Sequence, residues 1–250
     1  MTSGEMTTKV FVTGFGPFLD VTKNPSYEIV CRLPQTLPSG SKITIIAHPE
    51  PIPAAYHKIA EVVPKLIAEH DPDIVVHMGL AMDRDYFAVE RSAPKEGYHE
   101  IPDIARRVFT RAENKARFGK SAESQVTDIP LEQVVDFWTD SVAQARLRLP
   151  NPASSSGAAG KAQASGKKGI KATKEALKEV DVRLSDDVGT YVCGFIYYLS
   201  LLEMAKRGKK KNAIFFHVPP LGTEEDVETG LKVTESLIQS LVDVVIHEST

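Results

Sequence analysis

The sequence has little that would mark a secreted, membrane-bound or nucleic-acid-binding protein. Its 250 residues contain only two cysteines, Cys31 and Cys193, which argues against a disulfide scaffold or a cysteine-rich zinc site. No apolar run approaches the roughly 18–20 residues that a membrane span needs, and the N-terminal MTSGEMTTK lacks the order of a secretory signal. Lys and Arg number 30 against 33 Asp and Glu, so the basic excess expected of a nucleic-acid binder is missing. We therefore expect a cytoplasmic protein with free thiols and no nucleic-acid or membrane partner.

Common cofactor and metal motifs are also missing from the sequence. GFGPF at 14–18 follows an apolar run, but the third glycine of a GxGxxG pattern is replaced by Leu19, and Pro17 removes a backbone donor. The chain has no GxxxxGK phosphate loop, no GxSxG nucleophile elbow and no HExxH, and its histidines are scattered. We therefore expect neither a cofactor nor a metal.

What is present is an alternation of short apolar runs with longer segments of helical period. Strands are predicted at 9–13, 42–47, 73–80, 180–184 and 212–218, and helices from Asn24 and over 54–69, 131–149, 190–207 and 225–246. Pro64 is expected to end or kink its helix. The run 73–80 is too continuously apolar for a surface hairpin and fits a sheet covered on both faces. The pattern predicts an α/β fold: a three-layer, open, mostly parallel but mixed sheet with helices on both faces.

We expect a single domain over 1–250, because predicted strands of one sheet lie on both sides of an unusual stretch. That stretch, 150–171, is rich in Ser, Ala, Gly and Lys and has one aliphatic residue beyond alanine. It cannot bury enough apolar surface to offset the entropy of ordering. We interpret it as a flexible low-complexity insertion whose lysines are solvated.

Cys193 stands where a loop enters a predicted helix. A thiol in the first turn of a helix experiences the helix dipole and unpaired N–H groups, which favour the thiolate and could hold an acyl oxyanion. The alternative is that Cys193 is a small buried hydrophobic residue of a core helix.

His217 and Glu90 could act with this thiol. His217 ends a predicted strand, at the sheet edge where functional side chains gather, and could serve as a base; otherwise it is a structural histidine. Glu90 follows an apolar segment, and a buried carboxylate there needs a partner. That partner could be an imidazole, or an ion pair with Arg84 or Arg91 could satisfy it instead.

Several segments together resemble the pyroglutamyl peptidase I family of pyrrolidone-carboxylate cysteine peptidases, in variants closer to animal than to bacterial members. They are TGFGPF at 13–18, HMGLA at 77–81, AVER at 88–91, VGTYVCGFIYYLSL at 188–201 and FFHVPPLG at 215–222. The resemblance implies a hydrolase that removes N-terminal pyroglutamyl residues from peptides through a thioester, a thiol protease without a cofactor.

The same resemblance implies a role for individual residues. Cys193 would be the nucleophile, His217 the general acid/base and Glu90 the residue that orients the imidazole. Phe15 and Phe18 would line the pyroglutamyl pocket. We expect backbone N–H groups near Cys193 to hold the oxyanion, with assistance from Arg91, and we favour a monomer over a homo-oligomer.

The sequence departs from the bacterial pattern at the pocket wall. Leu19 and Asp20 stand where bacterial members have glycines after the PF pair, and Met82 and Asp83 stand where they have Gly-Gly before the arginine. These changes leave the three catalytic residue types in place. They keep two alternatives open: another thiol amidase or esterase on the same scaffold, or a non-catalytic pyroglutamate-binding homologue.

Overall fold

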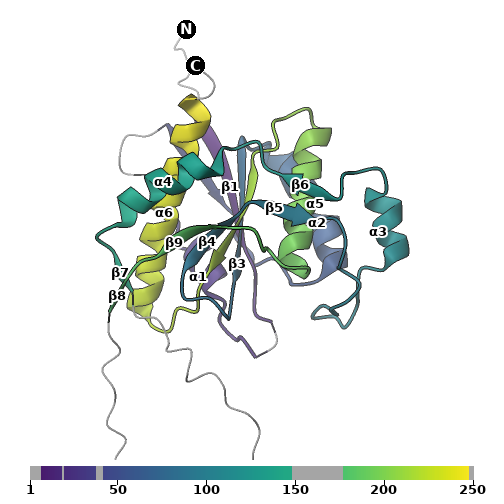
Figure 1. The fold of residues 1–250 in the computed structure, drawn as a ribbon, viewed down its shortest axis with the longest axis horizontal. Helices are drawn as coiled ribbons and strands as arrows, with labels where there is room; N and C mark the ends of the chain where they lie inside the picture. The colour runs from purple at the N-terminus through teal and green to yellow at the C-terminus, as the bar shows by residue number, and fades with distance from the viewer. Residues whose placement is uncertain (1–6, 19, 38–41, 148–176, 248–250) are drawn as a thin grey trace, which may run out of the picture.

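The structure is a computed structural model that describes residues 7–18, 20–37, 42–147 and 177–247 (Figure 1). The predicted insertion at 150–171 lies outside the described residues. Within the described ranges, no helix combines the length and apolar character needed to cross a membrane.

The centre of the molecule is a six-stranded sheet. Its order is β2 (Ile43–Ala47), β1 (Thr8–Gly14), β3 (Ile74–Leu80), β10 (Ala213–Val218), β4 (Phe87–Glu90) and β9 (Val182–Ser185). Every neighbouring pair is parallel except β10 with β4. The predicted mostly parallel, mixed sheet is therefore confirmed, and the continuously apolar strands β3 and β10 occupy its buried middle.

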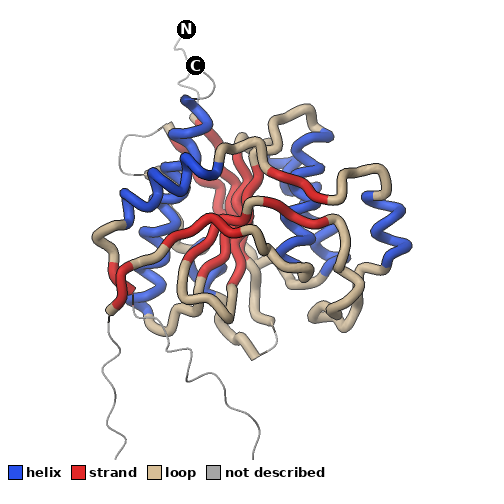
Figure 2. The backbone as a smooth tube through the Cα atoms, in the orientation of Figure 1, coloured by secondary structure: helices blue, strands red, loops and turns tan. Residues whose placement is uncertain are grey.

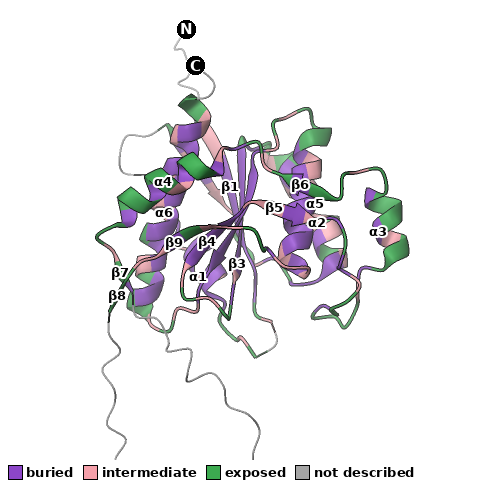
Figure 3. Cartoon of the chain, viewed as in Figure 1, coloured by how far each residue is buried: buried purple, intermediate pink, exposed green. Residues whose placement is uncertain are grey.

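Helices cover both faces of the sheet, which forms the central layer in Figure 2. One apolar cluster contains α2 (Tyr56–His70) and α5 (Val192–Lys206). The other contains α1 (Pro25–Val30), α4 (Leu131–Val142) and α6 (Glu224–His247). Because side chains alternate along a strand, Phe215 joins the first cluster and Phe216 the second. Burial follows the same division, with buried strands and buried inner helix faces (Figure 3).

Smaller elements flank this core. β5 (Ser92–Pro94) pairs with β6 (Ser124–Val126), and α3 (Arg111–Phe118) lies between them in the chain. β7 (Arg146–Leu147) pairs with β8 (Lys178–Glu179).

The structure differs from two expectations about where helices end. Pro64 does not end its helix, because α2 continues to His70; the carbonyl of Ala60, which proline deprives of its helical donor, accepts a hydrogen bond from Arg117 Nη2 at 2.9 Å instead. The helix predicted over 131–149 ends at Val142, because Arg146 and Leu147 form a strand pair with β8 and Leu147 is buried. Asn24 does cap α1, accepting a hydrogen bond from Ser26 N, with Pro25 in the first turn.

Candidate active site

The predicted site residues come from elements that meet at one edge of the sheet. β1, β3 and β10 are parallel, so their carboxyl ends lie at the same edge. His217 is close to that end of β10, and Phe15 directly follows β1. Glu90 is the last residue of β4 and is paired with Phe215. Cys193 is the second residue of α5, in its first turn, as expected from the sequence.

Glu90 and His217 form a buried hydrogen-bonded pair. Opposed residues of a strand pair point to the same face, and so do residues two apart in a strand; Glu90, opposite Phe215, therefore shares a face with His217. His217 Nδ1 lies 2.7 Å from Glu90 Oε1. Glu90 is fully buried, and His217 is 5% exposed. Since a carboxylate only accepts hydrogen bonds, Nδ1 carries the proton and Nε2 is left for proton transfer.

Glu90 has a second partner on the same oxygen. Arg84 Nη1 donates to Glu90 Oε1 at 2.6 Å. Burial pushes the pKa of the Glu90 carboxyl upward, but the hydrogen bond and charge of His217 and the hydrogen bond from Arg84 outweigh it, so this pKa lies below its ordinary value. The two alternatives considered for Glu90, an imidazole or an arginine, are thus both present.

The Cys193 thiol lies over β3 beside the strand that carries His217. A Cβ added at Gly79 would stand 3.3 Å from Cys193 Sγ, and Gly79 is the register partner of His217. Burial, followed by the negative charge of Glu90, raises the pKa of the thiol to about 12, against the lowering effect of the Arg84 charge and a backbone hydrogen bond. The expectation that the helix terminus favours a resting thiolate is therefore wrong for this site: desolvation dominates.

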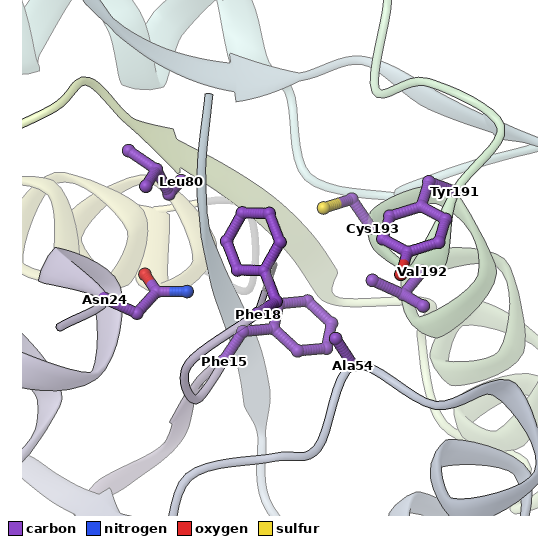
Figure 4. Close-up of a pocket in the computed structure, with 8 residues that line it drawn as sticks. All are labelled: Phe15, Phe18, Asn24, Ala54, Leu80, Tyr191, Val192 and Cys193. Carbon is purple, nitrogen blue, oxygen red and sulfur yellow. The ribbon is translucent and has the colours of Figure 1, made fainter. Parts of the chain in front are cut away.

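The sulfur points into a small apolar pocket with a cavity volume of about 60 Å³ (Figure 4). The lining residues are Phe15, Phe18, Asn24, Ala54, Leu80, Tyr191, Val192 and Cys193. The structure thus brings together the two phenylalanines and the thiol that the sequence singled out.

Other wall residues were missed. Asn24 was assigned only to the cap of α1, yet it also lines the pocket. Nothing in the local pattern marks Ala54 or Leu80, because each reaches the pocket through the arrangement of separate elements.

Arg91 does not lie with the other predicted residues, which corrects the expectation that it assists the oxyanion. Its guanidinium pairs with Glu132 of α4 and with Asp186, at 2.8 Å from Asp186 Oδ1. α4 packs on the face opposite α5. The cause is the pleat: Arg91 follows Glu90 directly, and consecutive residues of an extended chain point to opposite sides.

A second buried histidine connects the sheet to α5. His77 Nδ1 lies 2.7 Å from Thr13 Oγ1, and His77 Nε2 lies 2.7 Å from Ser200 Oγ. His77 is fully buried, and desolvation lowers its pKa to about 3. The neutral ring joins β1, β3 and the helix that carries Cys193. Sequence analysis gave this histidine no role of its own.

Chemically, the arrangement is compatible with a thiol hydrolase on an α/β scaffold: a thiol in a pocket, an imidazole on the strand next to β3 and a carboxylate hydrogen-bonded to that imidazole. No group of three or more His, Cys, Asp or Glu side chains in the described ranges is placed to hold a metal ion.

Comparison with known proteins defines the family. The family model described as pyroglutamyl peptidase matches residues 8–144 and 152–245. Pyroglutamyl-peptidase 1 of Homo sapiens is 26% identical over 237 residues, covering 94% of this chain and 90% of the relative. Pyrrolidone-carboxylate peptidase of Thermococcus onnurineus is 28% identical over 211 residues, covering 84% and 83%. The chain belongs to the pyroglutamyl peptidase family, a family of cysteine-type omega peptidases.

The fold agrees with this assignment. The crystal structure of pyrrolidone carboxyl peptidase from Pyrococcus furiosus superposes with a TM-score of 0.67 at 20% identity, covering 94% of this chain and 99% of that one. The family resemblance and the α/β fold predicted from the sequence are both confirmed.

Proposed function

We propose that this chain is a thiol protease that hydrolyses the bond after an N-terminal pyroglutamyl residue of peptides, with Cys193, His217 and Glu90 as its catalytic residues. The observation that carries the proposal is the buried His217–Glu90 pair beside a thiol-lined apolar pocket in a member of this family.

The pocket suits a pyroglutamyl ring. Pyroglutamate is a flat, uncharged lactam, so its recognition requires apolar surface and a few hydrogen bonds and no counter-charge. The rings of Phe15 and Phe18 supply the apolar walls (Figure 4). Asn24 Nδ2 donates one hydrogen bond to Gly16 O at 3.0 Å, and its second N–H is available for the lactam carbonyl.

The proposed reaction begins with a neutral thiol. As Cys193 Sγ bonds to the pyroglutamyl carbonyl carbon, its proton passes to His217 Nε2, and Glu90 stabilises the imidazolium. The N–H groups of the first turn of α5 have no helical acceptor, and Tyr191 at the N-cap supplies no side-chain cap, so they can hold the oxyanion. His217 then protonates the departing amine, the C–N bond breaks, and water activated by the same imidazole hydrolyses the thioester.

The test is release of aminocoumarin from a pyroglutamyl-aminocoumarin substrate. We expect Cys193→Ala to abolish release while the circular dichroism spectrum is retained. Cys31→Ala is the matched control, because Cys31 is exposed and remote from the pocket, and it should retain activity. Turnover by Cys193→Ala would refute the nucleophile. Prolyl-aminocoumarin should be rejected, since its charged amine would enter an apolar pocket; equal turnover would favour a general thiol amidase.

We also propose that the chain acts as one domain and as a cytoplasmic monomer that binds neither nucleic acid nor membrane. Support for one domain comes from β4 and β9, which lie on opposite sides of 148–176 in the chain and pair in one sheet. Support for the compartment comes from the free thiols of Cys31 and Cys193. Light scattering with size-exclusion chromatography should give a mass near 27.4 kDa; a multiple of that mass would contradict the monomer.

A further inference from the structure

Arg84 connects the site carboxylate to the loop that leads into the nucleophile helix. Its Nη1 donates to Glu90 Oε1 at 2.6 Å, and its Nη2 donates to the carbonyl oxygen of Asp187 at 2.6 Å. The Arg84 side chain is 12% exposed, and the Glu90 side chain is fully buried. One guanidinium therefore joins the end of β4 to the loop 186–191, which leads into α5.

This loop determines where α5 begins. Asp187 Oδ1 accepts a hydrogen bond from Gly189 N at 3.1 Å, and Gly189 has a left-handed backbone with φ 78°. A Cβ added at Gly194, the residue after the nucleophile, would stand 2.3 Å from Gly189 O. The loop thus packs directly on the first turn of α5, so a shift at Asp187 is transmitted to Cys193.

We propose that Arg84 is a positioning residue for the reaction. By donating hydrogen bonds to both Glu90 and the Asp187 carbonyl, it holds the imidazole and the nucleophile in the relative position that the reaction requires. Arg84 does not itself contact the substrate in this scheme. The inference rests on the proposed function of this site and adds a residue that the three-membered catalytic set does not contain.

Arg84 also sets the charge around the sulfur. Its positive charge lowers the pKa of the Cys193 thiol, whereas Glu90 raises it. The other titratable groups facing this region are His217, which bonds Glu90, Tyr197, whose hydroxyl donates to Glu90 O at 3.1 Å, and the Tyr56 and Tyr191 hydroxyls; burial raises the pKa of each of these tyrosines. Loss of the guanidinium would leave Glu90 with the imidazole as its sole charged partner among the described side chains.

The experiment compares Arg84→Met, Arg84→Lys and the control Arg183→Met. Both arginines lie over the Tyr86 ring: the Arg183 Cζ is 4.0 Å from the ring centroid, and the Arg84 Cζ is 5.7 Å from it. Arg183, however, forms its ion pair with Asp181. Arg84→Met should lower kcat on the order of 10²-fold, as expected for a misplaced reacting group, with KM close to wild type.

Arg84→Lys separates charge from geometry. A lysine restores the positive charge but cannot reach both acceptors with a planar fork, so the pH profile of Cys193 alkylation should stay close to wild type while kcat is low. Arg183→Met should leave both unchanged. A kcat loss in Arg84→Met no larger than in Arg183→Met, or full recovery of kcat in Arg84→Lys, would overturn the positioning role.

A second readout is independent of peptidase activity. In a Cys31→Ala background, the rate of iodoacetamide alkylation of Cys193 is followed from neutral to alkaline pH. Arg84→Met should shift this profile to higher pH, because the thiolate loses a neighbouring cation; an unshifted profile would contradict the inference. Absence of wild-type coumarin release would refute the proposed function alone, since the alkylation comparison still decides the effect of Arg84 on the thiol.

Discussion

The buried His77 makes a quantitative prediction about stability and pH. Its pKa is about 3 in the folded protein, because burial disfavours the charged ring, against about 6.5 in an unfolded chain. As the pH falls below the pKa of the histidine in the unfolded chain, the unfolded chain binds a proton that the folded protein does not bind. The free energy of unfolding therefore falls by about 1.4 kcal/mol per pH unit until the pH approaches the folded value.

Between about pH 7 and about pH 5, this linkage removes about 2 kcal/mol from the free energy of unfolding. The variant that isolates the effect is His77→Asn. Asparagine offers a donor and an acceptor towards Thr13 and Ser200 but does not titrate. All other titrating groups are common to both proteins, so their contribution cancels in the comparison.

The measurement is equilibrium urea unfolding of both proteins at the two pH values, followed by fluorescence of Trp138, which is fully buried. The wild type should lose about 2 kcal/mol more than His77→Asn on acidification. Equal losses would mean that His77 is charged in the folded protein or is not the buried neutral ring described. Because Ser200 and Cys193 lie on the same helix, kcat of His77→Asn also reports whether the network holds the nucleophile.

Two further substitutions test the site directly. Gly79→Ala would place a Cβ 2.7 Å from Phe215 Cζ and 3.3 Å from Cys193 Sγ. It should lower the free energy of unfolding in urea by about 1–3 kcal/mol, and it should lower kcat by displacing the sulfur. A wild-type kcat would contradict the placement of Cys193. Glu90→Gln should lower kcat on the order of 10²-fold or more, because the imidazolium of His217 loses its counter-charge. The pH profile of iodoacetamide alkylation of Cys193 should move to lower pH, since the Glu90 charge raises the thiol pKa; activity equal to wild type would leave Glu90 as a structural ion-pair partner.

Much of the fold could be predicted because the strands that are buried in the structure are apolar runs in the sequence. The run in β3 is apolar apart from His77, and both its faces are covered. Prediction failed where a distant residue intervened. Nothing near Pro64 indicates that Arg117 satisfies the carbonyl of Ala60. Likewise, nothing near Leu147 indicates that β8 ends the helix before it by pairing with that segment.

The site was predictable in its residue types and less so in its contacts. Cys193, His217 and Glu90 each lie at or near the end or start of an element. Parallel strands place His217 at the functional edge, whereas Glu90 reaches it from β4, which runs antiparallel to β10. The choice between Arg84 and Arg91 as the neighbour of Glu90 could have been made from the strand period, because a residue adjacent to Glu90 must point to the opposite face. The pocket role of Asn24 could not have been predicted in this way, because it depends on how α1 packs beside β1.

The apolar pocket and the reactivity of its thiol impose opposite demands. A neutral lactam is held best by apolar walls, but the same desolvation raises the pKa of Cys193 to about 12. A thiol with that pKa is almost entirely protonated at neutral pH, so attack must be coupled to proton transfer. The His217–Glu90 pair provides this coupling, because His217 Nδ1 lies 2.7 Å from Glu90 Oε1, which leaves Nε2 to take the proton as the sulfur attacks. The Arg84 charge then limits how strongly Glu90 disfavours the thiolate. We infer that His217, Glu90 and Arg84 together compensate for the raised thiol pKa that results from burying Cys193 in an apolar pocket.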